Sequence, residues 1–188
     1  ALGRERGVFA NYKGSRLESE GQRQRNATVT TVAPTGTISI IADCSPGIEP
    51  LYGVTFLRTV MEDVRLITVH PEFERRARAA GIYTIRLMER IAANESIQDL
   101  TDIPADLRRL FVTAHDIAPE RHVRMQAVFQ QYSDSGVSKT INLPVTATKE
   151  DVASAFRLAY RLGCKGVTVF RTGSRANQVL SCANVQYC

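Results

Sequence analysis

The segment 137–171 constrains the fold most, because its sequence is typical of a strand, a helix and a second strand in direct succession. Residues 137–144 (VSKTINLP) are rich in strand formers and end at a proline, and residues 166–171 (GVTVFR) form a second such run. Between the two runs, Thr148 can cap a helix with support from Asp151, three residues later. Two strands joined through a helix lie parallel in one sheet, so the sequence predicts an α/β fold.

The rest of the chain alternates between helical patterns and short strand-like runs. In the predicted helix 118–136, apolar side chains recur at helical spacing. Residues 1–25 are predicted to be irregular, and the tail 176–188 has no clear pattern. Three or four strands are few for a closed barrel, which favours part of a larger sheet. The predicted strands here are 27–33 and 52–60, the predicted helices are 37–42, 70–81, 83–95, 104–114 and 118–136, and the apolar residues at helical spacing are Val123, Ala127, Val128 and Tyr132.

Charge and cysteine content exclude several classes of protein. The net charge is +5, but no block of like charges occurs, so a solvated surface is favoured over a nucleic-acid binder. No run approaches the ~20 apolar residues that span a bilayer, and no apolar leader is visible, which favours a cytoplasmic protein without a membrane partner. The four cysteines form no C-x-x-C pair, and no histidines have metal-ligand spacing, so no metal site is predicted.

The stretch Pro34-Thr35-Gly36-Thr37 connects a predicted strand to a predicted helix. The first backbone N–H groups of a helix lack intrahelical partners and carry partial positive charge, so such a junction can bind an anion. Gly36 would let a phosphate approach the backbone, and the hydroxyls of Thr35, Thr37 and Ser39 could donate hydrogen bonds. No lysine follows, so this is not an ATPase-type P-loop. An ordinary capped strand–helix junction remains the alternative.

Three stretches in the same order resemble the catalytic subunit of ribonucleotide reductase. They are RNATVTTVAPTGTISIIADCSPGIEPLYGV, AHDIAPERHVRMQAVFQQYSDSGVSKTINLP and LGCKGVTVFRTGSR. They are most similar to the adenosylcobalamin-dependent branch, the class II enzymes. The resemblance implies the C-terminal portion of a ten-stranded α/β barrel, with parallel strands joined by helical crossovers and residues 26–175 as a partial barrel domain.

The resemblance also implies a site and partners. The phosphates of a ribonucleotide substrate would be held by Pro34, Thr35, Gly36, Thr37, Ile38 and Ser39. The complete enzyme would be a ribonucleoside-diphosphate reductase with adenosylcobalamin, a thioredoxin-type reductant and a homodimeric form, although these residues leave a di- or triphosphate substrate open. Adjacent tyrosines of the oxygen-dependent class are matched here by Thr168 and Val169, which favours radical initiation by a cofactor within the subunit.

The family's radical cysteine, in an N-x-C-x-E pattern, does not occur in this sequence. The chain alone is therefore expected to be inactive, and a non-catalytic nucleotide-binding module is the alternative. Cys44 and Glu49 are candidates for lining the active site, against roles in a buried turn. Cys182 and Cys188 resemble the family's redox tail, although their C-x5-C spacing is wider than expected.

Five further residues have a structural and a functional interpretation. For Lys139 and Arg171, at strand ends, phosphate contact competes with a surface or salt-bridge role. Cys164 is expected to be a core thiol. His115 and His122 are expected to form hydrogen bonds at helix ends.

Overall fold

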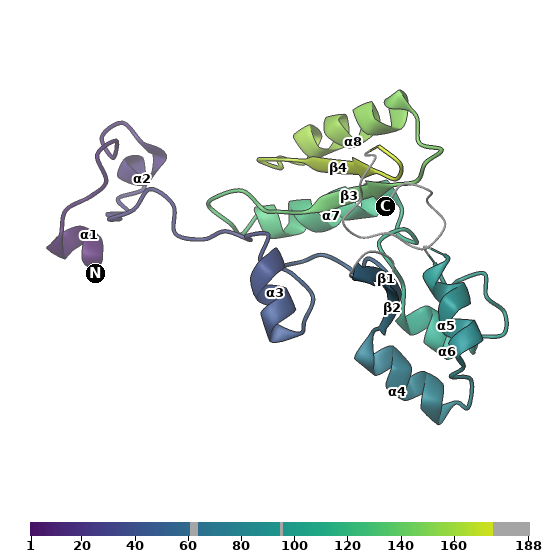
Figure 1. Ribbon diagram of the computed structural model, residues 1–188. Helices are drawn as coiled ribbons and strands as arrows, with labels where there is room; N and C mark the ends of the chain where they lie inside the picture. The colour runs from purple at the N-terminus through teal and green to yellow at the C-terminus, as the bar shows by residue number, and fades with distance from the viewer. Residues whose placement is uncertain (61–63, 95, 175–188) are drawn as a thin grey trace.

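The computed structural model describes residues 1–60, 64–94 and 96–174, and the predicted strand–helix–strand unit lies near its C-terminal end (Figure 1). Strands β3 (Thr140–Leu143) and β4 (Thr168–Arg171) are parallel and are joined through helix α8 (Lys149–Arg161). The Thr148 hydroxyl accepts from the Asp151 amide at 3.2 Å, and the Asp151 carboxylate accepts from the Thr148 amide at 2.7 Å. This capping box confirms the predicted start of the helix.

Helix α7 (Pro119–Gln130) packs on β3 and α8. Of the four apolar residues at helical spacing, Val123 and Ala127 are buried. Val128 and Tyr132 are exposed, and Tyr132 lies beyond the end of the helix. Polar side chains occupy part of the buried face instead. The core of this unit is formed by Val123, Ile141, Leu143, Ala155 and Ala159.

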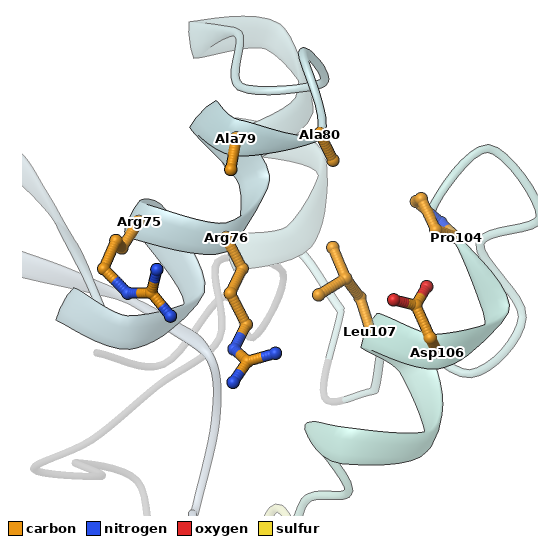
Figure 2. Close-up of a pocket in the computed structure, with 7 residues that line it drawn as sticks. All are labelled: Arg75, Arg76, Ala79, Ala80, Pro104, Asp106 and Leu107. Carbon is orange, nitrogen blue, oxygen red and sulfur yellow. The ribbon is translucent and has the colours of Figure 1, made fainter.

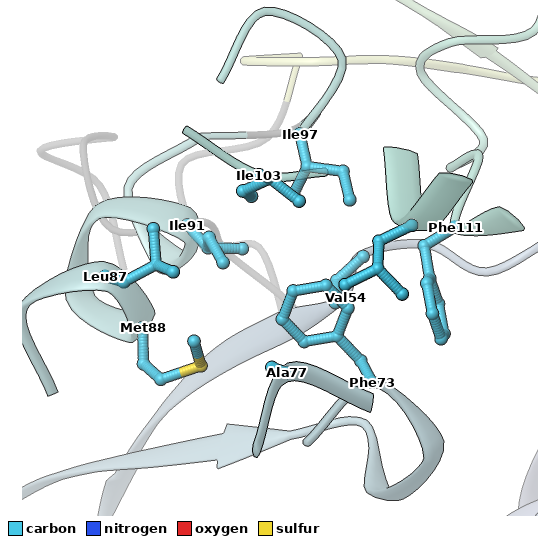
Figure 3. Close-up of a cluster of buried hydrophobic side chains, with 10 residues drawn as sticks. Val54, Phe73, Ala77, Leu87, Met88, Ile91, Ile97, Ile103 and Phe111 are labelled. Carbon is cyan, nitrogen blue, oxygen red and sulfur yellow. The ribbon is translucent and has the colours of Figure 1, made fainter. Parts of the chain in front are cut away.

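A second core lies around an antiparallel hairpin. Strands β1 (Thr55–Val60) and β2 (Val64–Val69) pair from Thr55↔Val69 to Val60↔Val64, and β2 was not among the predicted strands. Helices α4 (Pro71–Ala79), α5 (Ile85–Ala92) and α6 (Ala105–Leu110) follow in sequence. They begin and end within the predicted helical ranges. Their buried side chains meet in one cluster (Figure 3), made of Val54, Phe73, Ala77, Leu87, Met88, Ile91, Ile97, Ile103, Leu107 and Phe111.

The strand predicted at 27–33 is wrong. The segment is exposed and makes one parallel bridge, Val32↔Val137. The amides of Val29 and Thr30 donate to the Asp134 carboxylate, at 2.9 and 3.2 Å, rather than to a neighbouring strand. Because a side chain takes these donors, the β-branched residues do not extend the sheet.

The N-terminal region contains two single-turn helices where irregular structure was predicted. They are α1 (Leu2–Glu5) and α2 (Arg16–Ser19), and they lie apart from the other elements, at the left of Figure 1. Helix α3 (Gly36–Ala42) lies between them and the rest, as predicted for 37–42. Among the described residues, no helix combines the length and apolar character needed to cross a membrane.

Candidate functional site

The loop 34–39 places a helix start directly after Pro34. Thr35 has a φ of +52°, which turns the chain into α3. The first amide bonded inside the helix is that of Ser39, which donates to the Thr35 carbonyl at 3.0 Å. The amides of Gly36, Thr37 and Ile38 precede that bond and have no place in the helical ladder. Three successive donors therefore lie at the positive end of α3, as the sequence predicted.

The backbone of this loop is open to solvent. A Cβ added to Gly36 would meet no other atom within 4 Å, and Thr37 is exposed beside it. The three predicted hydroxyls are not equivalent. Thr35 is half-buried, whereas Ser39 is buried and its hydroxyl donates to the Gly36 carbonyl at 2.7 Å. Thr37 is thus the hydroxyl best placed to join the amides around a ligand.

Glu49 and Lys139 form a pair beside this loop. The Glu49 carboxylate accepts from Lys139 Nζ and from the Thr140 amide, each at 2.6 Å. The Lys139 side chain is only 2% exposed, so its expected surface position is wrong, whereas the expected salt bridge is present. Pairing with a carboxylate makes the burial of this ammonium group tolerable. The structure therefore engages Glu49 in holding β3 and leaves its role in lining an active site a prediction.

The cysteines differ in exposure. Cys44 follows α3 and is exposed, which rules out a buried turn position for it. Cys164 is half-buried, and burial raises the pKa of its thiol, in line with a core role. Cys182 and Cys188 lie outside the described residues. Across residues 1–60, 64–94 and 96–174, no group of three histidine, cysteine or acidic side chains could hold a metal ion.

His122 is a buried histidine whose Nε2 donates a hydrogen bond to the Ala114 carbonyl. Its Nε2 lies 3.0 Å from the Ala114 carbonyl oxygen. Burial, and next the nearby Lys139 ammonium, lower the pKa of His122, so the imidazole is neutral at pH 7. The Arg171 guanidinium donates to the carbonyl oxygens of Val145 and Ala147, and its contact with a phosphate stays a prediction.

The sequence analysis missed two buried glutamines on α7. Gln126 Nε2 donates to the Val137 carbonyl at 2.9 Å and to the Gly166 carbonyl at 2.8 Å, in the segments that lead into the two parallel strands. Gln130 is also buried and donates to the Ser135 carbonyl at 2.8 Å. His122, Gln126 and Gln130 are each four residues apart, so they lie on one face of the helix. This spacing in the sequence was a signal from which a polar buried face could have been predicted.

A pocket of about 350 Å³ lies elsewhere, between α4 and α6 (Figure 2). Arg75 and Arg76 line one side of it and Asp106 lies on the other. Both guanidinium groups donate to Glu72 at 2.6 Å, and these bonds lower the pKa of Glu72 to about 2. None of the predicted site residues lines this pocket.

Comparisons with known proteins point to one family. The family model "Ribonucleotide reductase, barrel domain" matches residues 3–170. The chain is 49% identical over 186 residues to a vitamin B12-dependent ribonucleoside-diphosphate reductase from Thermoplasma acidophilum, covering 99% of the chain and 24% of that protein. A protein of the same description from Mycobacterium tuberculosis is 46% identical over 182 residues, covering 97% and 26%. The chain thus spans about a quarter of the length of these curated relatives.

A solved structure supports the fold independently of close sequence identity. The alpha subunit of the class Id ribonucleotide reductase from Actinobacillus ureae superposes with a TM-score of 0.66 at 24% identity, covering 87% of this chain and 30% of that one. Together with the family match, this likeness confirms the predicted α/β class and the assignment to a portion of a barrel.

Proposed function

This chain belongs to the ribonucleotide reductase family, and from that premise we propose that it is the C-terminal part of the catalytic subunit of an adenosylcobalamin-dependent reductase. The complete enzyme reduces ribonucleoside diphosphates to deoxyribonucleotides by radical chemistry. Within it, residues 26–175 contribute a partial barrel domain, flanked by 1–25 and the tail 176–188. The part played by this chain is to hold the substrate's phosphates at loop 34–39.

One observation carries the proposal: consecutive amides at the start of α3 precede its first helical hydrogen bond, and the space beside Gly36 is open. The first helical bond begins at Ser39, and Gly36 has no atom within 4 Å of where a Cβ would stand. A phosphate needs several donors converging on it and room to approach the backbone. The exposed Thr37 hydroxyl adds a further donor, and Pro34 and Ile38 flank the turn. A neutral, exposed turn of this kind suits an anion better than an apolar ligand.

The cobalamin branch rests on two lines of support. Both relatives described above carry vitamin B12 dependence in their descriptions, at 46–49% identity. In addition, β4 presents Thr168 and Val169 where the oxygen-dependent class has adjacent tyrosines. When bound to the complete enzyme, adenosylcobalamin supplies the radical initiation. We assign no step of that radical chemistry to the residues of this chain.

The further partners of the complete enzyme follow from the same proposal. A thioredoxin-type reductant restores its active-site thiols, with Cys182 and Cys188 as the candidate relay and the exposed Cys44 as a candidate at the site. The subunit is homodimeric and cytoplasmic, with no nucleic-acid or membrane partner. An upstream coding sequence with an N-x-C-x-E pattern in a long barrel domain is expected, and an unrelated domain there would exclude the proposal.

The functional test uses the complete subunit and the variant Gly36→Val. The added side chain fits the fold, because nothing lies within 4 Å, but it blocks the approach of a phosphate to the amides. We expect the KM for ribonucleotide to rise at least about tenfold while the Kd for cobalamin is unchanged. Gly136→Val is the matched control, because Gly136 is exposed with equal clearance.

Three outcomes separate the alternatives. A raised KM in Gly36→Val alone supports the assignment of the phosphate site. An equal KM in both glycine variants contradicts it. If calorimetry showed ribonucleotide binding but the complete subunit reduced no ribonucleotide, the non-catalytic nucleotide-binding module would be favoured. The motivation for that alternative is that this sequence has no N-x-C-x-E pattern.

A further inference from the structure

The stretch 135–138, which leads into β3, is only partly paired with residues 28–33. The Ser135 amide donates to the Thr30 carbonyl at 2.9 Å, and the Ser138 amide donates to the Val32 carbonyl at 2.8 Å. Amides on one edge of a strand alternate, so the next donor on this edge is Thr140. A continuing parallel strand would offer it a carbonyl near residue 34. The chain instead leaves the sheet there to form loop 34–39.

Glu49 takes the place of the missing strand. Its Oε1 accepts from the Thr140 amide at 2.6 Å, and its Oε2 accepts from Lys139 Nζ at 2.6 Å. Lys139 Nζ also donates to the Thr140 carbonyl at 2.7 Å, so both backbone groups of Thr140 are engaged by this pair. A carboxylate hydrogen bond to an amide is stronger than the neutral bond it replaces. The Thr140 amide on this edge is therefore held by a side chain 91 residues away in sequence.

The turn that carries Glu49 also touches the base of the loop. Gly47 has a φ of +53°, and a Cβ there would lie 3.2 Å from the Ala33 carbonyl oxygen and 3.9 Å from Thr35 Oγ1. The Glu49 amide donates to the Pro46 carbonyl at 3.0 Å, which closes this turn. A shift of Glu49 would therefore move the residues packed against Ala33 and Thr35.

We propose that Glu49, paired with the buried Lys139, is a positioning residue that fixes where loop 34–39 leaves the sheet and so sets the geometry of its amides for substrate phosphate. The inference rests on the proposed function of that loop. Glu49 touches the loop's frame and not the substrate. Glu49 acts on substrate affinity by orienting the amide donors of the loop. A displacement of these donors by about 1 Å can weaken substrate binding strongly.

The test compares Glu49→Ala, Lys139→Met and the double variant in the complete subunit. Glu49→Ala leaves the Lys139 charge buried without its partner, so we expect lower thermal stability together with a ribonucleotide KM raised about tenfold or more. The double variant removes that charge, so stability returns while the raised KM persists, because the Thr140 amide is still unheld. Glu49→Gln, which keeps an acceptor for that amide, should recover most of the wild-type KM.

Glu120→Gln is the matched control, since Glu120 pairs with Arg124 at 2.8 Å on the exposed face of α7. It should alter neither KM nor stability. If the double variant recovered KM together with stability, the pair would be an ordinary stabilising contact and the inference would be wrong. If Gly36→Val raised KM but Glu49→Ala did not, the inference alone would fail. If neither did, the proposed phosphate site would fail with it.

Discussion

Replacing Gln126 by leucine tests how α7 is fixed to the parallel sheet. The change keeps the size of the side chain but removes both donors, to the carbonyls of Val137 and Gly166. Losing the bond to the Gly166 carbonyl costs about 0.5–1.5 kcal/mol of unfolding free energy. Losing the bond to the Val137 carbonyl costs about 1–3 kcal/mol, because that carbonyl is left buried without a partner. Gln126 Oε1 is itself buried without a hydrogen-bond partner among the described residues, so its removal returns roughly 1 kcal/mol. The net loss of unfolding free energy is therefore expected to be about 2 kcal/mol.

Urea denaturation followed by far-UV circular dichroism measures this loss. Gln131→Leu is the control, because Gln131 caps the C-terminal end of the same helix and is exposed. A surface substitution of this kind changes the unfolding free energy by less than about 0.5 kcal/mol. If the two leucine variants lost equal stability, or if Gln126→Leu fell within the same narrow range, the two hydrogen bonds would not fix the helix as argued.

Three more predictions concern stability. Thr148→Ala removes the hydroxyl of the capping box with Asp151 and should lower the unfolding free energy by about 1 kcal/mol in urea denaturation, unlike an exposed Thr146→Ala. The folded-state pKa of His122 is lowered from 6.5, so the neutral imidazole contributes fully to the unfolding free energy above pH 6.5, and this contribution is lost as the pH falls through the folded-state pKa. An NMR titration midpoint at or above 6.5 for His122 would contradict this prediction. The pKa of Glu72 is lowered from 4.5 to about 2, so its contribution is lost as pH falls between those values, and Glu72→Gln should flatten that part of the acid-denaturation curve.

The strand–helix–strand unit at 137–171 could be predicted because each of its signals is local. The proline after the first strand, the Thr148–Asp151 pair and a glycine at the helix end all act within a few residues of themselves. The structure confirms the order and the parallel pairing of this unit. Helix α3 was predictable for the same reason, since the Thr-Gly turn alone marks its start.

The partners of strands and of charged side chains could not be predicted from the sequence in the same way, because they lie far away along the chain. The run 27–33 has strong strand propensity, but its amides at Val29 and Thr30 find Asp134, more than a hundred residues later. Strand β2 was missed although its residues are strand formers, because a strand is defined by its partner as much as by its own sequence. Among charged residues, Lys139 was expected at the surface because lysine is seldom buried, and only its distant partner explains the exception.

The position of loop 34–39 depends on residues far from it in sequence. Helix α3 has seven residues, too few to be stable alone, and its side chains give it little burial, since Ile38 is 61% and Ile41 is 81% exposed. Its position must therefore come from the two segments that enter and leave it. One is tied to the sheet by the bridge at Val32, and the other by Glu49. A change at Lys139 can therefore reach the amides of this loop without touching them, because it acts on the tie that holds one end of α3.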